Sequence, residues 1–167
     1  MQSITALLET LQASSWAVFI HKTAWAFTTV EVVHVFAVSL LLGTIAIVDL
    51  RLLGVASTKR PFAELSRQVL PFTWGAFALA VIAGSLLFIS RATEYFVNPV
   101  FWIKMVLIVV AGINMAIFEF KTVRGVQEWN LSASPPTAAR LAGGISIGCW
   151  LLVLFFGRLI AFTLPTE

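Results

Sequence analysis

Six ionisable side chains interrupt or follow long apolar runs, and they are the residues with which this chain could do chemistry. They are Glu31, His34, Arg91, Glu94, Lys104 and Arg158. Glu31 and His34 stand three residues apart, which places both on one face of a helix. A charged group near the centre of a bilayer costs about 2.5–3.5 kcal/mol, so each needs a partner or a function. The pattern therefore indicates a polar intramembrane cavity that binds or passes a small ion or solute.

The six side chains are expected near one side of the membrane, so the pattern also predicts how they meet. We expect Glu31 to pair with Arg158 or Lys104, leaving His34 free to gain or lose a proton. The competing interpretation is structural, since lysine and arginine near the interface extend their charged ends to water. Asn114 lies in the middle of its apolar run, and we expect it to donate a hydrogen bond between helices or to line the same cavity.

Metal and haem centres are a second class of chemistry to consider. A zinc or copper site uses three or four His, Cys or carboxylate ligands, and His34 is the candidate metal ligand inside an apolar run. A haem b between two helices uses two axial histidines, and the second histidine, His21, lies outside the apolar runs. Motifs of phosphate loops, nucleophile elbows and zinc proteases are absent. A non-enzymatic protein is the leading hypothesis, and a haem- or copper-binding redox subunit is the alternative.

The composition decides which kind of fold must position these residues. Of the 167 residues, 59% are hydrophobic and 11% are charged, and the mean hydropathy is +0.95. Soluble domains are roughly 45–50% apolar and about 25% charged, so this chain has too little polar surface for a water-soluble fold. The single cysteine, Cys149, forms no internal disulfide. The composition predicts a membrane protein with several spans in a lipid bilayer.

Four apolar runs have the length that a membrane-spanning helix needs, about 20 residues. They cover about residues 25–48, 69–90, 100–120 and 142–164. The stretch 3–12 has the apolar spacing of a short amphipathic helix that lies on the membrane interface. The prediction is therefore an all-α, four-helix membrane bundle that forms a single domain over residues 1–167, with an interfacial helix at its N-terminal end.

Basic residues near the helix ends predict the orientation of the bundle. The two loops expected on one side carry Arg51, Lys59, Arg60, Arg67, Lys121, Arg124 and Arg140. The positive-inside rule places these loops in the cytoplasm and both termini outside, in the periplasm of a bacterial inner membrane. The basic residues are split between two loops, which argues against a nucleic-acid partner.

Small residues at four-residue spacing predict where helices approach closely. Ala76, Ala80 and Gly84 form one such series, and Gly144 and Gly148 form another. We interpret both as packing seams within the bundle or between protomers. A homo-oligomer is therefore expected, or a role as the structural partner subunit of a membrane complex.

Several motifs together resemble an uncharacterised family of small bacterial four-helix inner-membrane proteins, known as a domain of unknown function. These motifs are Glu31-x-x-His34, Asp49-Leu50-Arg51-Leu52-Leu53-Gly54, Leu70-Pro71-Phe72-x-Trp74, Asn98-Pro99-x-Phe101-x-x-Lys104, Asn114 and Gly157-Arg158-Leu159-Ile160-Ala161. The resemblance covers nearly the whole chain and implies the same topology, without an assigned activity. The layout is more loosely similar to copper-resistance membrane proteins and to small four-helix cytochromes b, which implies metal or haem as candidate cofactors.

Overall fold

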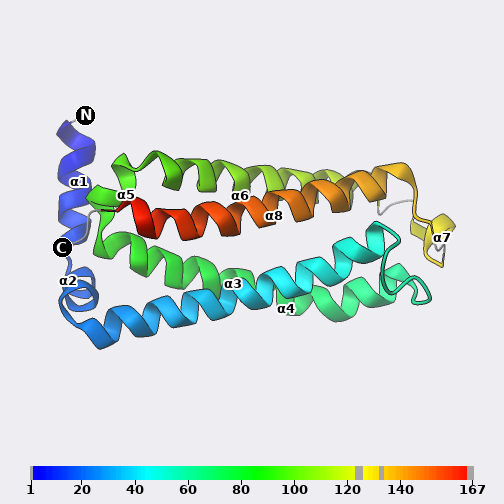
Figure 1. Ribbon diagram of the computed structural model, residues 1–167, viewed down its shortest axis with the longest axis horizontal. Coiled ribbons are helices and arrows are strands. Elements are labelled where there is room, and N and C mark those ends of the chain that lie inside the picture. Colours follow the sequence, from blue (N-terminus) through cyan, green and yellow to red (C-terminus); the bar gives the residue numbers. More distant parts are fainter. Residues whose placement is uncertain (1, 123–125, 132–133, 165–167) are drawn as a thin grey trace.

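The computed structural model describes residues 2–122, 126–131 and 134–164, and the regular elements in these ranges are all helical (Figure 1). In chain order they are α1 (Gln2–Gln12), α2 (Ser15–Lys22), α3 (Ala24–Leu52), α4 (Phe62–Ser90), α5 (Ala92–Val97), α6 (Pro99–Ile117), the π-helical turn η1 (Phe118–Thr122), α7 (Val126–Trp129) and α8 (Thr137–Thr163). Arg124 lies outside the described residues. Four of these helices are long and apolar enough to span a membrane, namely α3, α4, α6 with its extension to Lys121, and α8. The predicted all-α four-helix fold of an integral membrane protein is confirmed, as is the short N-terminal helix.

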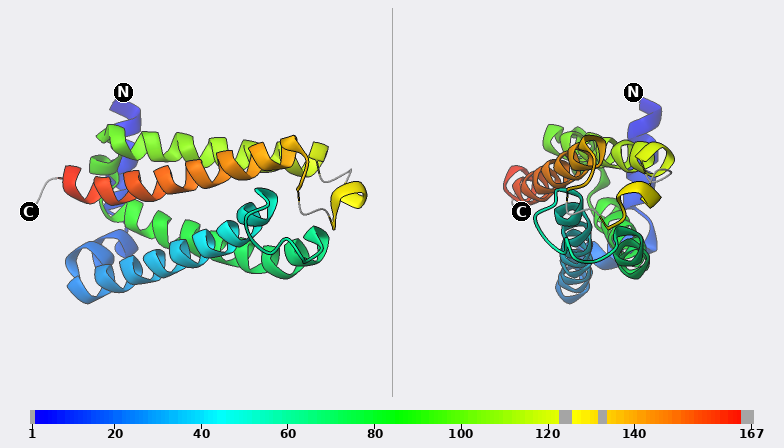
Figure 2. Two further views of the ribbon diagram at one scale, coloured as in Figure 1. Left: turned by 45° about the vertical axis from the view of Figure 1, so that its right-hand side comes forward. Right: turned by 90° about the vertical axis from the view of Figure 1, so that its right-hand side faces the viewer.

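The bundle has two ends that differ in structure. One end, here called the termini end, holds α1, α2, α5 and the last turn of α8, whereas the α3–α4 loop and α7 lie at the other, the loop end (Figure 1). α3 packs along α4, α6 packs along α8, and the two pairs meet through α3 and α8 (Figure 2). In the described part of the chain, α4 and α6 do not pack along each other. The seam between α4 and α6 is therefore the loosest in the bundle.

The spanning helices extend further toward the loop end than the apolar runs predict. α3 continues to Leu52, α4 begins at Phe62, and α8 begins at Thr137, each four to seven residues beyond the predicted boundary. Pro71, which lies near the predicted start of its apolar run at residue 69, is inside α4. The extension of α4 is amphipathic, with Phe62 and Leu65 buried, so packing within the protein continues the helix where the membrane-length apolar run has ended.

Hydrogen bonds from Arg51 and Asn130 close the loop end. The Arg51 side chain is fully buried, and it donates from Nε to the Arg60 carbonyl at 3.1 Å and from Nη2 to the Asn130 carbonyl at 3.1 Å. Asn130 in turn caps α4, because its carbonyl accepts from the Phe62 amide at 3.0 Å and its Oδ1 accepts from the Ala63 amide at 2.9 Å. These contacts, here called the loop-end cap, tie the α3–α4 loop to the segment that follows α7.

An apolar cluster supports the loop-end cap from inside the bundle. Leu52, Phe62, Trp129 and Ala139 are buried together, and Phe118 packs against them. The rings of Phe62 and Trp129 have centroids 5.0 Å apart, and those of Phe62 and Phe118 have centroids 5.8 Å apart. The cluster joins residues from α3, α4, α7, α8 and η1, so it holds all the elements of this end together.

α3 and α8 approach each other closely at Gly143. A Cβ atom there would lie 3.0 Å from both the Asp49 carbonyl oxygen and Leu52 Cβ. The expected contact residues on this helix were Gly144 and Gly148, but a Cβ at Gly148 would have no neighbour within 4 Å. The predicted seam therefore lies on the right helix, and its tight contact is one residue earlier than the nearer glycine of the predicted pair. Such small residues let helix backbones pack at short range in lipid.

α1 lies across the termini end of the bundle, at a steep angle to the long helices (Figure 1). Its last residue, Gln12, accepts hydrogen bonds at Oε1 from the Thr93 amide at 3.2 Å and from Thr93 Oγ1 at 2.9 Å. Ser14 then caps α2 by accepting from the Ala17 amide at 3.4 Å. These contacts attach α1 and α2 to the short helix α5.

Candidate functional site

Glu31 and His34 lie on α3 in the termini half of the bundle, and their surroundings differ. Glu31 is exposed, whereas His34 is half-buried against α4. The His34 Nδ1 atom is 2.9 Å from the Ala80 carbonyl oxygen, within hydrogen-bond distance. A Cβ atom at Gly84 would be 2.9 Å from His34 Cε1, so the absence of a side chain at Gly84 makes room for the imidazole ring. His34 is thus held between α3 and α4.

Lys104 and Arg158 approach the termini half from α6 and α8. Lys104 is half-buried beside Gly157 of α8, where its Nζ atom would lie 3.8 Å from an added Cβ. Arg158 is exposed, and its guanidinium lies 5.3 Å from the centroid of the Phe162 ring. In the described residues no ion pair joins Glu31 to Lys104 or to Arg158.

Arg91 and Glu94 meet at the junction of α4 and α5, where Arg91 Nη2 and Glu94 Oε2 form an ion pair at 2.7 Å. Tyr95 lies in the same turn and is half-buried. Burial raises the pKa of its phenol, and the nearby charges of Arg91, Glu31 and Glu94 also act on it. Glu31 is therefore electrostatically linked to this cluster at the termini end.

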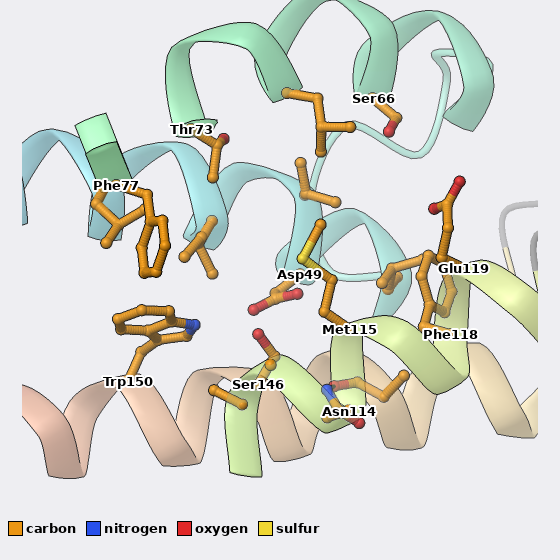
Figure 3. Close-up of a pocket in the computed structure, with 18 of the residues that line it drawn as sticks. Asp49, Ser66, Thr73, Phe77, Asn114, Met115, Phe118, Glu119, Ser146 and Trp150 are labelled. Carbon is orange, nitrogen blue, oxygen red and sulfur yellow. Dashed lines mark hydrogen bonds between the residues drawn. The ribbon is translucent and has the colours of Figure 1, made fainter. Parts of the chain in front are cut away.

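A cavity of about 200 Å³ lies in the opposite, loop-end half of the bundle (Figure 3). All four spanning helices contribute residues to the cavity wall. The residues from α4 and α6 lie along the loose seam between these two helices. Most of its lining is apolar. Its aromatic walls are Phe62, Trp74, Phe77, Phe118 and Trp150, and its polar side chains are Asp49, Ser66, Thr73, Asn114, Glu119 and Ser146.

Asn114 serves both the packing and the cavity. Its Nδ2 atom donates to the Ala142 carbonyl at 2.9 Å, which joins α6 to α8, and the residue lines the cavity in the loop-end half. The hydrogen bond between helices that was expected of Asn114 is therefore present, but the cavity it lines is not the one expected in the termini half. One turn further along, Glu119 lines the same cavity from the π-helical turn η1. Such turns occur frequently at functional sites.

Asp49 is the polar group that sequence reasoning missed. Its side chain is only 5% exposed and lies beside Ser146, a hydrogen-bond partner of the carboxyl, and near Trp150 (Figure 3). Its Oδ2 atom has no hydrogen-bond partner among the described residues. The apolar run predicted for this helix, residues 25–48, ends just before Asp49, but α3 continues to Leu52 and brings the carboxyl inside the bundle. The apolar run carries no signal for this extra turn.

The four spanning helices lie within a region that this chain shares with a known family. The pattern of a family of unknown function (DUF6644) matches residues 10–163, which include α3, α4, α6 and α8. The chain belongs to this family. No curated protein and no solved structure matches it. The predicted resemblance to a family of small membrane proteins of unknown function is therefore confirmed.

The described side chains of this DUF6644 protein do not form a cluster that fits a metal centre. In the described part of the chain, no three His, Cys, Asp or Glu side chains lie close enough together to hold a metal ion. His34, the candidate ligand, has Nδ1 at the Ala80 carbonyl and its ring against Gly84. A metal site uses several such donors, and a haem between helices usually uses two. We therefore derive no redox step from these residues of the protein.

The fit of His34 against α4 predicts an effect of Gly84→Ala. The new methyl group would come within 2.9 Å of His34 Cε1, so the ring must move away from the Ala80 carbonyl. We expect a loss of about 1 kcal/mol in the free energy of unfolding of the DUF6644 bundle, measured by denaturant titration in micelles. Gly75→Ala is the matched control, because a Cβ there has no neighbour within 4 Å. Equal stability of the two variants would contradict the proposed role of Gly84.

Proposed function

We propose that this protein binds a small amphiphilic molecule inside its helical bundle, in the cavity beside Asp49. One observation carries the proposal: a carboxyl group that is 5% exposed has an oxygen without a hydrogen-bond partner in the described residues, and it faces an apolar cavity. Ionisable groups within membrane helices are costly and often mark ligand or ion pathways. An apolar cavity with a few convergent polar groups is the common form of a small-molecule site.

The proposal keeps the expected binding of a solute but moves the binding site to the loop-end half. In a transport role, the bound molecule would pass Glu31, His34 and Lys104, which lie in the other half of the same helices. The charged groups of the termini half would then line the route of the solute instead of forming its binding site. Binding alone requires only the cavity, so binding is the part of the proposal to test first.

We further propose that the loop end faces the cytoplasm of a bacterium and the termini end faces the periplasm. The basic residues gather at the loop end, where Arg60, Arg67 and Arg140 are exposed. α1 would lie on the outer surface of the inner membrane, since it crosses the bundle end and exposes Ile4, Leu7 and Leu11.

Filling the cavity should abolish binding of a small amphiphile. Gly112 lines the cavity, and a Cβ atom there would have no neighbour within 4 Å, so Gly112→Leu can place its side chain without a clash at Cβ. We expect naphthylmethanol to raise the melting temperature of the wild-type protein in micelles and to leave that of Gly112→Leu unchanged. Calorimetric titration should show the same loss of binding.

Gly148→Leu is the matched control for this experiment. Gly148 also has no neighbour within 4 Å of an added Cβ, but it does not line the cavity. Its response to naphthylmethanol should therefore equal that of the wild type. If both leucine variants respond like the wild type, the probe is partitioning into the micelle and the proposed binding function is wrong. If the wild type itself does not respond, the cavity does not bind a small amphiphile.

A further inference from the structure

The ionisable groups that line the cavity all have the same sign. Asp49 and Glu119 are both acidic, and no lysine, arginine or histidine is among the lining residues. Asp49 is buried and has an oxygen without a hydrogen-bond partner in the described chain, whereas Glu119 is exposed. A buried carboxylate is stabilised by a counter-charge, and the protein places none within the cavity. The lining is therefore complementary to a positive charge.

The walls of the cavity favour an organic cation over a metal ion. Trp150 lies near Asp49, and Phe77 and Phe118 are further aromatic walls (Figure 3). Trp74 also lines the cavity. Aromatic faces attract ammonium groups and also provide apolar contact for the rest of the molecule. Hard metal ions instead need six or more oxygen ligands or retained water molecules, and this largely apolar lining does not provide them.

The shape of the bundle indicates how such a molecule reaches Asp49. The loop-end cap and the cluster of Phe62 and Trp129 close one end, and the contact at Gly143 closes the seam between α3 and α8. The seam between α4 and α6 is loose, and Trp74 of α4, which lines the cavity, is 52% exposed at the outer surface of the bundle. Access is therefore lateral, from the bilayer.

We propose that the cavity selects an amphiphilic organic cation, an amine or quaternary ammonium on an apolar body, which enters between α4 and α6 and places its charge at Asp49. This inference rests on the proposed binding function and specifies the chemical class of the ligand. A phospholipid amine is less well matched, because its phosphate would find no basic residue in the lining. The ligand class is thus an amine without a phosphate.

Three naphthyl probes of similar shape but different charge test whether the charge of a ligand determines its affinity. Naphthylmethylamine is cationic at pH 7, naphthylmethanol is neutral and naphthoate is anionic. We expect the wild-type protein to bind the amine at least about ten-fold more tightly than the alcohol, and to bind the carboxylate least, in calorimetric titrations at fixed ionic strength. Equal affinity for amine and alcohol would overturn the cation preference. It would leave the proposed binding function intact, because that function fails if the alcohol does not bind or if Gly112→Leu responds to it like the wild type.

Asp49→Asn tests the residue that carries the preference. The amide is nearly isosteric but uncharged, so the variant should bind the alcohol as the wild type does and lose the preference for the amine. Glu64→Gln is the matched control, because Glu64 is an exposed carboxylate that does not line the cavity, so its loss should change the ratio by less than about three-fold. If Asp49→Asn retains the ten-fold preference, Asp49 is not the anchor. Should this variant fail to fold, the probe series on the wild type still decides the charge preference.

A competition experiment distinguishes a free amine from a lipid headgroup. Short-chain phosphatidylethanolamine should not displace naphthylmethylamine from the wild-type protein at concentrations where tetraethylammonium does. Displacement by the phospholipid at comparable concentration would overturn the proposed ligand class and assign the cavity to a lipid headgroup.

Discussion

Arg51→Ala should lower the free energy of unfolding by about 3 kcal/mol, since it removes two hydrogen bonds from a charged donor at about 1.5 kcal/mol each. Both bonds cross between segments: one goes to the Arg60 carbonyl in the α3–α4 loop and the other to Asn130 after α7. The side chain is fully buried, so water does not replace these bonds unless the loop end opens. Denaturant titration in micelles, followed by far-ultraviolet circular dichroism, measures the loss.

Two further variants show whether the loss comes from these hydrogen bonds. Arg51→Lys keeps the positive charge but replaces the planar guanidinium, which reaches two carbonyls at once, with a single ammonium group. We therefore expect the Arg51→Lys variant to retain only part of the stability. Arg67→Ala removes an exposed arginine from the same end of the bundle and should change stability by less than about 0.5 kcal/mol. If Arg51→Ala is as stable as Arg67→Ala, the loop-end cap does not stabilise the fold.

Gly143→Leu is expected to destabilise the bundle by about 3 kcal/mol, at the upper end of the range for overpacking. Its Cβ alone would lie 3.0 Å from the Asp49 carbonyl oxygen and 3.0 Å from Leu52 Cβ. The first of these α3 atoms belongs to the backbone, and the second is bonded directly to it. Neither atom can move without moving α3, so α3 and α8 must separate. Since Asp49 lines the cavity, we also expect the variant to lose binding of naphthylmethanol.

A substitution of the same chemistry on the same helix provides the comparison. Gly148→Leu lies about one and a half turns further along α8 and has free space around its Cβ. It should keep wild-type stability or gain up to about 1 kcal/mol, because leucine favours the helix more than glycine does. Equal losses at both positions would mean that the effect reflects leucine in this helix and not the contact with α3.

Much of the fold could be predicted from the sequence, because hydropathy reports directly on the bilayer. Apolar runs of about 20 residues have few stable alternatives to a spanning helix, so the number of spans and the fold class are confirmed. The helix boundaries were less accessible. The polar residues between 62 and 68 carry no membrane signal, and α4 extends through them because Phe62 packs in the loop-end cluster and Asn130 caps its first amides.

The candidate site depended on those boundaries, and this is why Asp49 was missed. A carboxyl at the last residue of an apolar run is expected in the headgroup region, whereas the same carboxyl three residues before the end of a longer helix points into the bundle. The charged residues of the termini half were selected by their depth alone. Which of them meet depends on the rotation of each helix about its axis, and hydropathy does not encode this rotation. Glu31 was therefore expected to pair with Arg158 or Lys104, whereas Arg158 lies over Phe162.

Because Asn130 caps α4, the contact between them also determines the order in which parts of the protein can assemble. The amide of Ala63 and the side chain that accepts its hydrogen bond are 67 residues apart in sequence. At a synthesis rate of roughly 5–20 residues per second, the ribosome needs about 3–13 seconds to reach that partner. During this interval the first helical hairpin stands in the membrane with the first turn of α4 uncapped by Asn130, and it reaches its final form only when the third span has followed it.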